Sequence, residues 1–297
     1  MSQMLLSGCG TALVTPFTRQ GAVDERAMRA LVQWQLEEGV HFLVPCGSTG
    51  EAVTLTPAEH RRVVELTVDV VGGRVPVVAG AGSNDTAKAI ALSKEMAAAG
   101  ATHLLHVSPM YNKPPQRGLV AHFRAIAEAV NLPIVVYNVP GRTASNIEAR
   151  TTIELASVPG IVAVKEASGN VGQVADILRE CPPNFSVLSG DDSLTLPLMA
   201  LGALGVISVV SNATPRLMAQ LVNACAAGDF AKGRTLHQQL QPWMAAAFVE
   251  SNPIPVKAAL SMMGRMENVV RLPLVPLSET HTAAVRRALQ TAGALAS

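Results

Sequence analysis

The chain has 297 residues, of which 49% are hydrophobic and 15% are charged, and its formal net charge is +1. This composition can build a large apolar core and excludes an intrinsically disordered protein. Lysine and arginine are scattered without a basic block, so the sequence offers no electrostatic footprint for nucleic acid.

Two segments bear on the cellular location. Residues 1–17 contain no lysine or arginine and so lack the charged start of a signal peptide. The longest weakly polar run, 194–210, is interrupted by Pro197, Gly202 and Gly205, which is typical of buried helix, turn and strand rather than a membrane span. We therefore expect a soluble, cytoplasmic protein with no membrane partner.

A repeating unit organises the chain: an apolar, β-branched run, then a loop of small polar residues, then a segment with helical periodicity. Strands are expected at 8–17, 42–47, 75–82, 103–109, 133–140, 161–168, 186–191 and 205–212, and the helices between them include 24–38, 57–71, 85–99 and 118–130. The sequence Thr56-Pro-Ala-Glu59 is typical of a helix start. Near-continuous apolar strands alternating with helices indicate parallel pairing with both sheet faces covered.

Eight such units in about 215 residues favour an α/β fold, a closed (β/α)8 TIM barrel, over an open doubly wound sheet. Residues 1–230 are expected to form this barrel. Residues 231–297 show a helical pattern without a strand and are expected to form a C-terminal helical extension. Such barrels have their active sites at the C-terminal ends of the strands, so polar residues at these ends are the candidates for catalysis and substrate binding.

Lys165 stands near the C-terminal end of the sixth predicted strand. With a period of two, its face is shared by Ile161, Ala163 and Ala167, while Val162, Val164 and Glu166 lie on the other face. An ammonium group removed from water lowers its pKa, which leaves neutral amine able to attack a carbonyl. The pattern favours Schiff-base chemistry; the alternative is a structural lysine paired with a carboxylate such as Glu166 or Asp191.

Further polar residues fall at the same ends of the strands. Tyr111 and Tyr137 are the only tyrosines, and Tyr137 ends the strand before that of Lys165, within reach of its amine, although a buried tyrosine can also be a plain core hydroxyl. The turn Gly47-Ser-Thr-Gly50 offers hydroxyls and backbone N–H groups to a small carboxylate. The alternative is an ordinary strand-to-helix turn that binds nothing. The planar guanidinium group of Arg142 can form a bidentate pair with a second carboxylate. Together these residues predict a site for an α-keto acid and a second anionic substrate.

Several motifs occur in a specific order along nearly the whole chain. They are Gly10-Thr-Ala-Leu-Val-Thr-Pro-Phe17, Gly47-Ser-Thr-Gly-Glu51, Val107-Ser-Pro-Met-Tyr-Asn112, Tyr137-Asn-Val-Pro-Gly-Arg-Thr143, Val164-Lys-Glu-Ala-Ser-Gly169, Leu188-Ser-Gly-Asp-Asp192 and Asn252-Pro-Ile-Pro-Val-Lys257. In these motifs the sequence resembles the pyruvate-dependent class I aldolases of the dihydrodipicolinate synthase and N-acetylneuraminate lyase type. The segment around Arg142 is similar to the synthase branch, in which this arginine binds the carboxylate of aspartate semialdehyde.

The resemblance implies roles for particular residues. The catalytic residues would be Lys165 for the imine with pyruvate, Tyr137 for proton relay, Ser48 for a relay hydroxyl where the family more often has threonine, and Tyr111 for a tyrosine contributed to the neighbouring subunit's site. The substrate-binding residues would be Thr49, which with Ser48 holds the pyruvate carboxylate, Arg142 for the second carboxylate, and Gly190 and Ile207 in the pocket lining.

The implied reaction is the condensation of pyruvate with L-aspartate 4-semialdehyde to 4-hydroxy-tetrahydrodipicolinate, in lysine and diaminopimelate biosynthesis. The resemblance implies no metal or organic cofactor, and a homotetramer built as a pair of tight dimers. Two alternatives remain open: a related aldolase acting on a 2-keto-3-deoxy sugar acid or a hydroxy-oxo acid, and a catalytically silent barrel that binds small acids. The Arg142 loop disfavours the first, and the intact set of Lys165, Tyr137 and Ser48 disfavours the second.

A departure from the family pattern concerns feedback by lysine. Lysine-inhibited members have a histidine, a glutamate and an aromatic residue in a dimer-interface pocket where this chain has Pro57, Lys88 and Met110. His60 and Asn84 match, but Lys88 repels the effector's ammonium groups and Met110 removes a stacking platform. We expect lysine inhibition to be weak or absent.

Overall fold

The computed structural model describes residues 5–296. Its strands are β1 (Gly8–Ala12), β2 (Phe42–Val44), β3 (Val78–Gly80), β4 (His103–Val107), β5 (Ile134–Asn138), β6 (Ile161–Glu166), β7 (Ser186–Ser189) and β8 (Gly205–Ser208). Its helices are α1 (Glu25–Glu37), α2 (Pro57–Val71), α3 (Thr86–Ala98), α4 (Gln116–Ala129), α5 (Pro140–Thr143), α6 (Ala149–Ala156), α7 (Val171–Glu180), α8 (Thr195–Ala200), α9 (Pro215–Ala226), α10 (Phe230–Ala246), α11 (Ile254–Met262) and α12 (Glu279–Thr291). Short 3-10 helices are η1 (Ala52–Thr54), η2 (Asp192–Leu194) and η3 (Val210–Asn212). Within residues 5–296, no helix has the length and apolarity needed to span a membrane.

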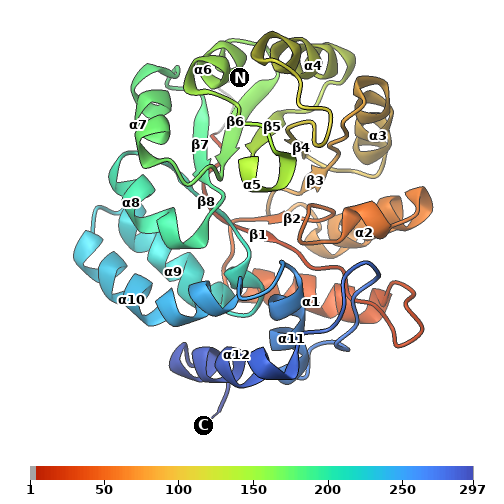
Figure 1. Ribbon diagram of the computed structural model, residues 1–297, viewed down its shortest axis with the longest axis vertical. Helices are drawn as coiled ribbons and strands as arrows, with labels where there is room; N and C mark the ends of the chain where they lie inside the picture. Colours follow the sequence, from red (N-terminus) through yellow and green to blue (C-terminus); the bar gives the residue numbers. More distant parts are fainter. Residues whose placement is uncertain (1–4, 297) are drawn as a thin grey trace.

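The strands form one parallel sheet in the order β2-β1-β8-β7-β6-β5-β4-β3. A parallel bridge between Leu43 and Val77 joins the two ends of this order, and the Leu43 N–H donates to the Pro76 carbonyl at 3.0 Å. The sheet therefore closes on itself, and the helices surround it as an outer layer (Figure 1). The predicted (β/α)8 TIM barrel with C-terminal helices is confirmed.

The observed strands are shorter than the predicted ones because the last residues of several apolar runs turn into the loops at the mouth. The run 205–212 is the clearest case, since it divides into β8 and η3. There the N–H groups of Val209 and Val210 donate to Asp192 Oδ2, at 3.0 and 3.2 Å, instead of continuing the sheet ladder. The start of α2 agrees with the prediction, because Thr56 and Glu59 form a reciprocal capping box.

The alternation predicted for β6 is wrong at its first residues. The pairing of β6 with β5 shifts register between the pairs Ile134–Ile161 and Val135–Ala163, so the strand contains a bulge at Val162. As a result Ile161 packs in the outer core under the helices, whereas Val162 packs against the barrel interior. Beyond the bulge the alternation is regular, and Lys165 points inward as predicted.

The interior of the barrel is filled with side chains. Phe42, Val135 and Leu188 are fully buried there. A Cβ atom at Gly10 would lie 2.0 Å from Cε2 of Phe42, so the aromatic ring occupies space that only glycine leaves free. This packed layer forms a floor below the mouth of the barrel.

The C-terminal helices pack on the barrel as one further layer. Helix α10 lies against α8 and α9, and α12 lies against α10 and α11 (Figure 1). The Trp243 side chain is fully buried, and its Nε1 donates to the carbonyl of Val210 at 3.1 Å. The division at residue 230 stays a prediction; α10 begins at that position.

Candidate active site

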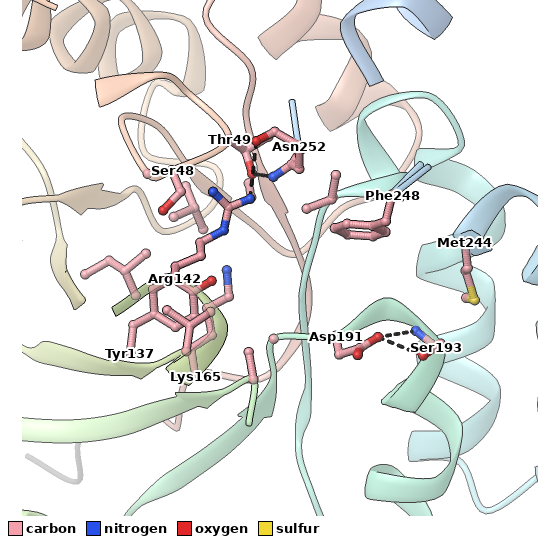
Figure 2. A pocket seen from close by; sticks show the side chains of 18 of the residues that line it. Ser48, Thr49, Tyr137, Arg142, Lys165, Asp191, Ser193, Met244, Phe248 and Asn252 are labelled. Atoms are coloured by element: carbon pink, nitrogen blue, oxygen red, sulfur yellow. Dashed lines mark hydrogen bonds between the residues drawn. The ribbon is translucent and has the colours of Figure 1, made fainter. Parts of the chain in front are cut away.

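A cavity of about 480 Å³ opens at the C-terminal ends of the strands, and we call it the main cavity. The barrel contributes Ser48, Thr49, Tyr137, Arg142, Lys165 and Gly190 to its lining, and the C-terminal region contributes Gln241, Met244, Phe248 and Asn252. Figure 2 shows Lys165, Tyr137 and Arg142 gathered together, with Met244 and Phe248 on the far side. The structure thus brings most of the sequence-predicted residues into one site.

Lys165 and Tyr137 are paired by the sheet itself. They are register partners on the neighbouring strands β6 and β5, and Lys165 Nζ lies 4.1 Å from the centroid of the Tyr137 ring. Lys165 is 5% exposed, and within residues 5–296 its amine forms no hydrogen bond or ion pair. The amine therefore meets a phenol ring and the cavity rather than a fixed partner.

The alternative of a lysine neutralised by Glu166 or Asp191 is wrong. The Glu166 carboxylate points to the helix side of β6, where it accepts from Asn138 Nδ2 and Gln173 Nε2. Asp191 Oδ1 accepts from the backbone N–H and the hydroxyl of Ser193, at 2.9 and 2.8 Å. Both carboxylates are used elsewhere, so neither holds the ammonium form of Lys165.

Burial sets the protonation state of the lysine. Desolvation lowers the pKa of Lys165 to about 7, opposed by the negative charge of buried Asp192 and assisted by the positive charge of Arg142. Burial also raises the pKa of Asp192 to about 6, against hydrogen bonds that favour its charged form. Near pH 7 about half of the Lys165 amine is neutral, which is the form that attacks a carbonyl.

Tyr137 carries its proton throughout the neutral range. Burial raises its pKa to about 12, with Arg142 acting in the opposite direction. The phenol can therefore donate a proton or a hydrogen bond to an oxygen atom near Lys165.

Gly190 makes room for the lysine side chain. A Cβ atom at this position would lie 3.0 Å from both Cγ and Cε of Lys165 and 2.7 Å from Cβ of Ala167. Gly190 was predicted to line the pocket, and its lack of a side chain is required because any side chain here would displace the Lys165 amine.

The turn after β2 offers free backbone donors. The N–H groups of Gly50 and Ala52 donate to the carbonyl of Gly47, and that of Glu51 donates to the carbonyl of Ser48. Within the described chain, residues 5–296, the N–H groups of Ser48 and Thr49 have no such acceptor. Adjacent free N–H groups in a tight turn form a concave site for an anion.

The side chains around this turn tie it to distant segments. Thr49 Oγ1 accepts from Asn252 Nδ2 at 2.9 Å, and the Asn252 carbonyl accepts from Arg142 Nη2 at 3.2 Å. The Ser48 side chain is exposed to the cavity. Free donors and an arginine on the same cavity wall suit a substrate pair with two carboxylates.

Residues 5–292 match the dihydrodipicolinate synthetase family. The chain belongs to this family. The 4-hydroxy-tetrahydrodipicolinate synthase of Koribacter versatilis is 53% identical, over 98% of both chains. Among solved structures, a monomeric dihydrodipicolinate synthase variant is 43% identical with a TM-score of 0.96 over 98% of both chains. The dihydrodipicolinate synthase of Acinetobacter baumannii, solved in complex with pyruvate, is 42% identical with a TM-score of 0.96, over 97% of this chain and 99% of that one.

Two residues to which the family resemblance assigned roles lie outside the main cavity. Tyr111 is 88% exposed, with a φ of 74°, and does not line the cavity of its own chain. Ile207 is fully buried in the barrel interior, and Val209, two residues nearer the mouth, lines the cavity instead. The placement of Ile207 in the pocket lining needs correction, since its side chain lies in the floor layer.

The sequence did not reveal the outer wall of the cavity. Gln241, Met244 and Phe248 come from α10 and the residues after it, which show only an amphipathic helical pattern. Of the C-terminal wall only Asn252 belongs to a family motif.

A second buried lysine, Lys257, was also missed as a chemical feature. Its Nζ lies 2.6 Å from Glu51 Oε1, and both side chains are almost wholly buried. Burial lowers the pKa of Lys257 to about 8, while the adjacent Glu51 carboxylate raises it. The Lys257 amine is ion-paired and lies outside the main cavity, whereas the Lys165 amine faces the cavity.

Residues 5–296 contain no group of three or more His, Cys, Asp or Glu side chains placed to hold a metal ion.

Proposed function

We propose that this member of the dihydrodipicolinate synthetase family condenses pyruvate with L-aspartate 4-semialdehyde to give 4-hydroxy-tetrahydrodipicolinate, a step of lysine and diaminopimelate biosynthesis. The observation that carries the proposal is the buried, unpaired Lys165 amine beside Tyr137 in the main cavity. The choice of aldehyde follows the relatives, which at 53% and 50% identity are named 4-hydroxy-tetrahydrodipicolinate synthase.

The first step joins pyruvate to the enzyme. The Ser48 and Thr49 N–H groups hold the pyruvate carboxylate, and the neutral Lys165 amine attacks the ketone carbon. Tyr137 donates a proton to the ketone oxygen, which leaves as water when the imine forms. This is the single water lost in the overall reaction.

The second step makes the carbon–carbon bond. Tyr137, which gave up its proton in the first step, takes a proton from the pyruvate methyl group and so converts the imine to an enamine. When the enamine carbon attacks the aldehyde, Tyr137 passes this proton to the aldehyde oxygen, which becomes the hydroxyl group of the product. Arg142 holds the carboxylate of the semialdehyde in a bidentate pair during this attack. The substrate's own amine then displaces Lys165 from the imine carbon, which closes the ring and restores the free lysine.

The proposal includes a homotetramer assembled from tight dimers, in which Tyr111 completes the site of a neighbouring subunit. The 88% exposure of this large aromatic side chain supports the proposal, since its own cavity does not use it. We also propose a cytoplasmic location, supported by the free thiols of Cys9, Cys46, Cys181 and Cys225.

The test is pyruvate consumption by the purified protein with and without aspartate semialdehyde. We expect rapid loss of pyruvate that requires the semialdehyde and disappears in Lys165→Ala, while Lys232→Ala, at an exposed lysine on α10, behaves as wild type. Arg142→Ala should raise the semialdehyde KM far more than the pyruvate KM. If pyruvate is trapped on Lys165 by borohydride but is not consumed, the aldehyde is wrong and sugar-acid aldehydes should be tried. If no pyruvate is trapped, the barrel is not an aldolase.

A further inference from the structure

The turn that presents the Ser48 and Thr49 N–H groups ends in a buried charge network. Glu51 follows the turn directly and has a φ of 53°, an unusual backbone conformation for a residue with a side chain. Its Oε1 accepts from Lys257 Nζ at 2.6 Å, and its Oε2 accepts from the backbone N–H of Arg271 at 3.0 Å. Both oxygens of the carboxylate are therefore bound by segments more than 200 residues away, since the sequence separations are 206 and 220.

The network extends beyond this pair in a way that fixes Arg271. The Arg271 guanidinium forms an ion pair with Glu59 near the start of α2 and donates to the carbonyls of Gly21 and Thr54. The Phe17 ring lies 4.1 Å from Lys257 Nζ and 4.3 Å from Arg271 Cζ, measured to its centroid. Four separate segments of the chain, namely residues 17–21, residues 51–59, Lys257 and Arg271, therefore meet at the end of the turn.

Two other residues of the turn, Thr49 and Gly50, are held by hydrogen bonds between neutral groups. Thr15 Oγ1 donates to the carbonyl of Gly50 at 2.7 Å, and Asn252 donates to Thr49 Oγ1 at 2.9 Å. A Cβ at Gly50 would lie 3.1 Å from the Leu13 carbonyl oxygen, so the backbone here is closely packed. The Glu51 side chain supplies the charged anchor in this arrangement.

A buried ion pair is a poor device for stability alone. Removing both charges from water costs so much that apolar residues of similar volume often stabilise a core as well or better. A buried pair does fix geometry, because each partner tolerates little displacement once it is desolvated. Glu51 of this pair comes two residues after Thr49, the second of the anion-binding donors, and this position indicates what geometry the pair fixes.

We propose that Glu51 and Lys257 are positioning residues, which hold the Ser48 and Thr49 N–H groups in the orientation that binds the carboxylate of pyruvate. The inference rests on the proposed function. It assigns a task to the C-terminal region beyond lining the cavity: Lys257 in α11 and the backbone of Arg271 preorganise the substrate site of the barrel. Neither side chain lines the main cavity, so the effect should appear in the binding of pyruvate rather than in the chemistry of Lys165.

The test compares Glu51→Gln, Lys257→Met and the double variant by steady-state kinetics. We expect the pyruvate KM to rise about tenfold or more in each, in line with the loss of well-oriented donors to a charged group. The semialdehyde KM should stay within about twofold, and saturating pyruvate should still label Lys165 fully under borohydride. The double variant removes both charges together and so avoids the uncompensated buried charge that could unfold a single variant.

Glu25→Gln serves as a matched control, because it alters an exposed ion pair between Glu25 on α1 and Arg62 on α2 and should leave both KM values unchanged. An unchanged pyruvate KM in a folded double variant, with only its thermal stability altered, would overturn the positioning role. Failure of the wild-type protein to form a trapped adduct with pyruvate would instead overturn the proposed function. A rise in both KM values together would also contradict the inference, since it would indicate general damage to the site.

Discussion

The titration of the Lys165 amine is the most direct quantitative consequence of the site. With a pKa of about 7, the amine should be about 9% neutral at pH 6 and about 91% neutral at pH 8. A lysine in water, with a pKa of about 10.4, would be only about 0.4% neutral at pH 8. At that pH the site therefore holds roughly 200 times more reactive amine than an ordinary lysine would.

The sign follows from burial. Desolvation penalises the ammonium form, so protonation requires a lower pH than usual, and the nucleophile is lost as the pH falls through 7. The charge of Asp192 opposes this shift, because a nearby anion favours the ammonium form. Asp192→Asn should keep an acceptor for the Val209 and Val210 N–H groups, and it should lower the pKa of Lys165 further because the nearby negative charge is gone.

Competitive labelling with a trace of acetic anhydride measures this midpoint. Acetylation of the Lys165 peptide would be followed by mass spectrometry from pH 5 to pH 10, with free phenylalanine as an internal standard whose own titration is divided out. We expect labelling to rise tenfold per pH unit below 7 and to level off above 8. A rise that continues unbroken to pH 10 would refute the argument from burial, and an unshifted midpoint in Asp192→Asn would refute the role of that charge.

Three further predictions concern activity and stability. Gly190→Ala should lower kcat about 100-fold by displacing the Lys165 amine. Gly118→Ala is the control, because its Cβ would meet only ordinary contacts at 3.4 Å, and it should leave the steady-state rates unchanged. Equal rates in the two variants would contradict the steric effect. Lys165→Met should stabilise the protein. Burial lowers the pKa of Lys165 from 10.5 to about 7, and this reduces the free energy of unfolding by up to about 5 kcal/mol below pH 7 and not at all above pH 10.5. Urea unfolding should therefore show a larger gain at pH 6 than at pH 10, and the reverse order would count against it. Millimolar lysine should leave the activity nearly unchanged, since Lys88 replaces an acid; a strong loss in an inhibition curve would show this prediction to be wrong.

The fold was predictable because its signals are local. Each strand, loop and helix carries its own pattern, as the capping box of Thr56 and Glu59 illustrates. The pairing of Lys165 with Tyr137 was also within reach, because consecutive strands of a parallel barrel are neighbours. Local reasoning failed at the bulge of β6, since periodicity assumes a regular register and cannot place an extra residue.

The rest of the site depends on contacts between distant segments. The pair of Glu51 and Lys257 spans 206 residues, and each partner alone looks like an ordinary charged residue. The wall contributed by Met244 and Phe248 likewise has no chemical signature, because apolar residues at helical spacing are the usual sign of core packing. Such features follow from how the C-terminal helices dock, which the sequence pattern does not specify.

The composite wall of the main cavity bears on how new specificities arise in this fold. The groups that we propose to form the imine lie on strands and tight turns of the barrel, whereas Met244 and Phe248 belong to a helix and a loop that follow it. Mutations on this added surface can reshape the space for the incoming aldehyde without disturbing the register that sets Lys165 against Tyr137. Directed evolution toward other aldehydes should therefore begin at α10, where variation is separated from the chemistry.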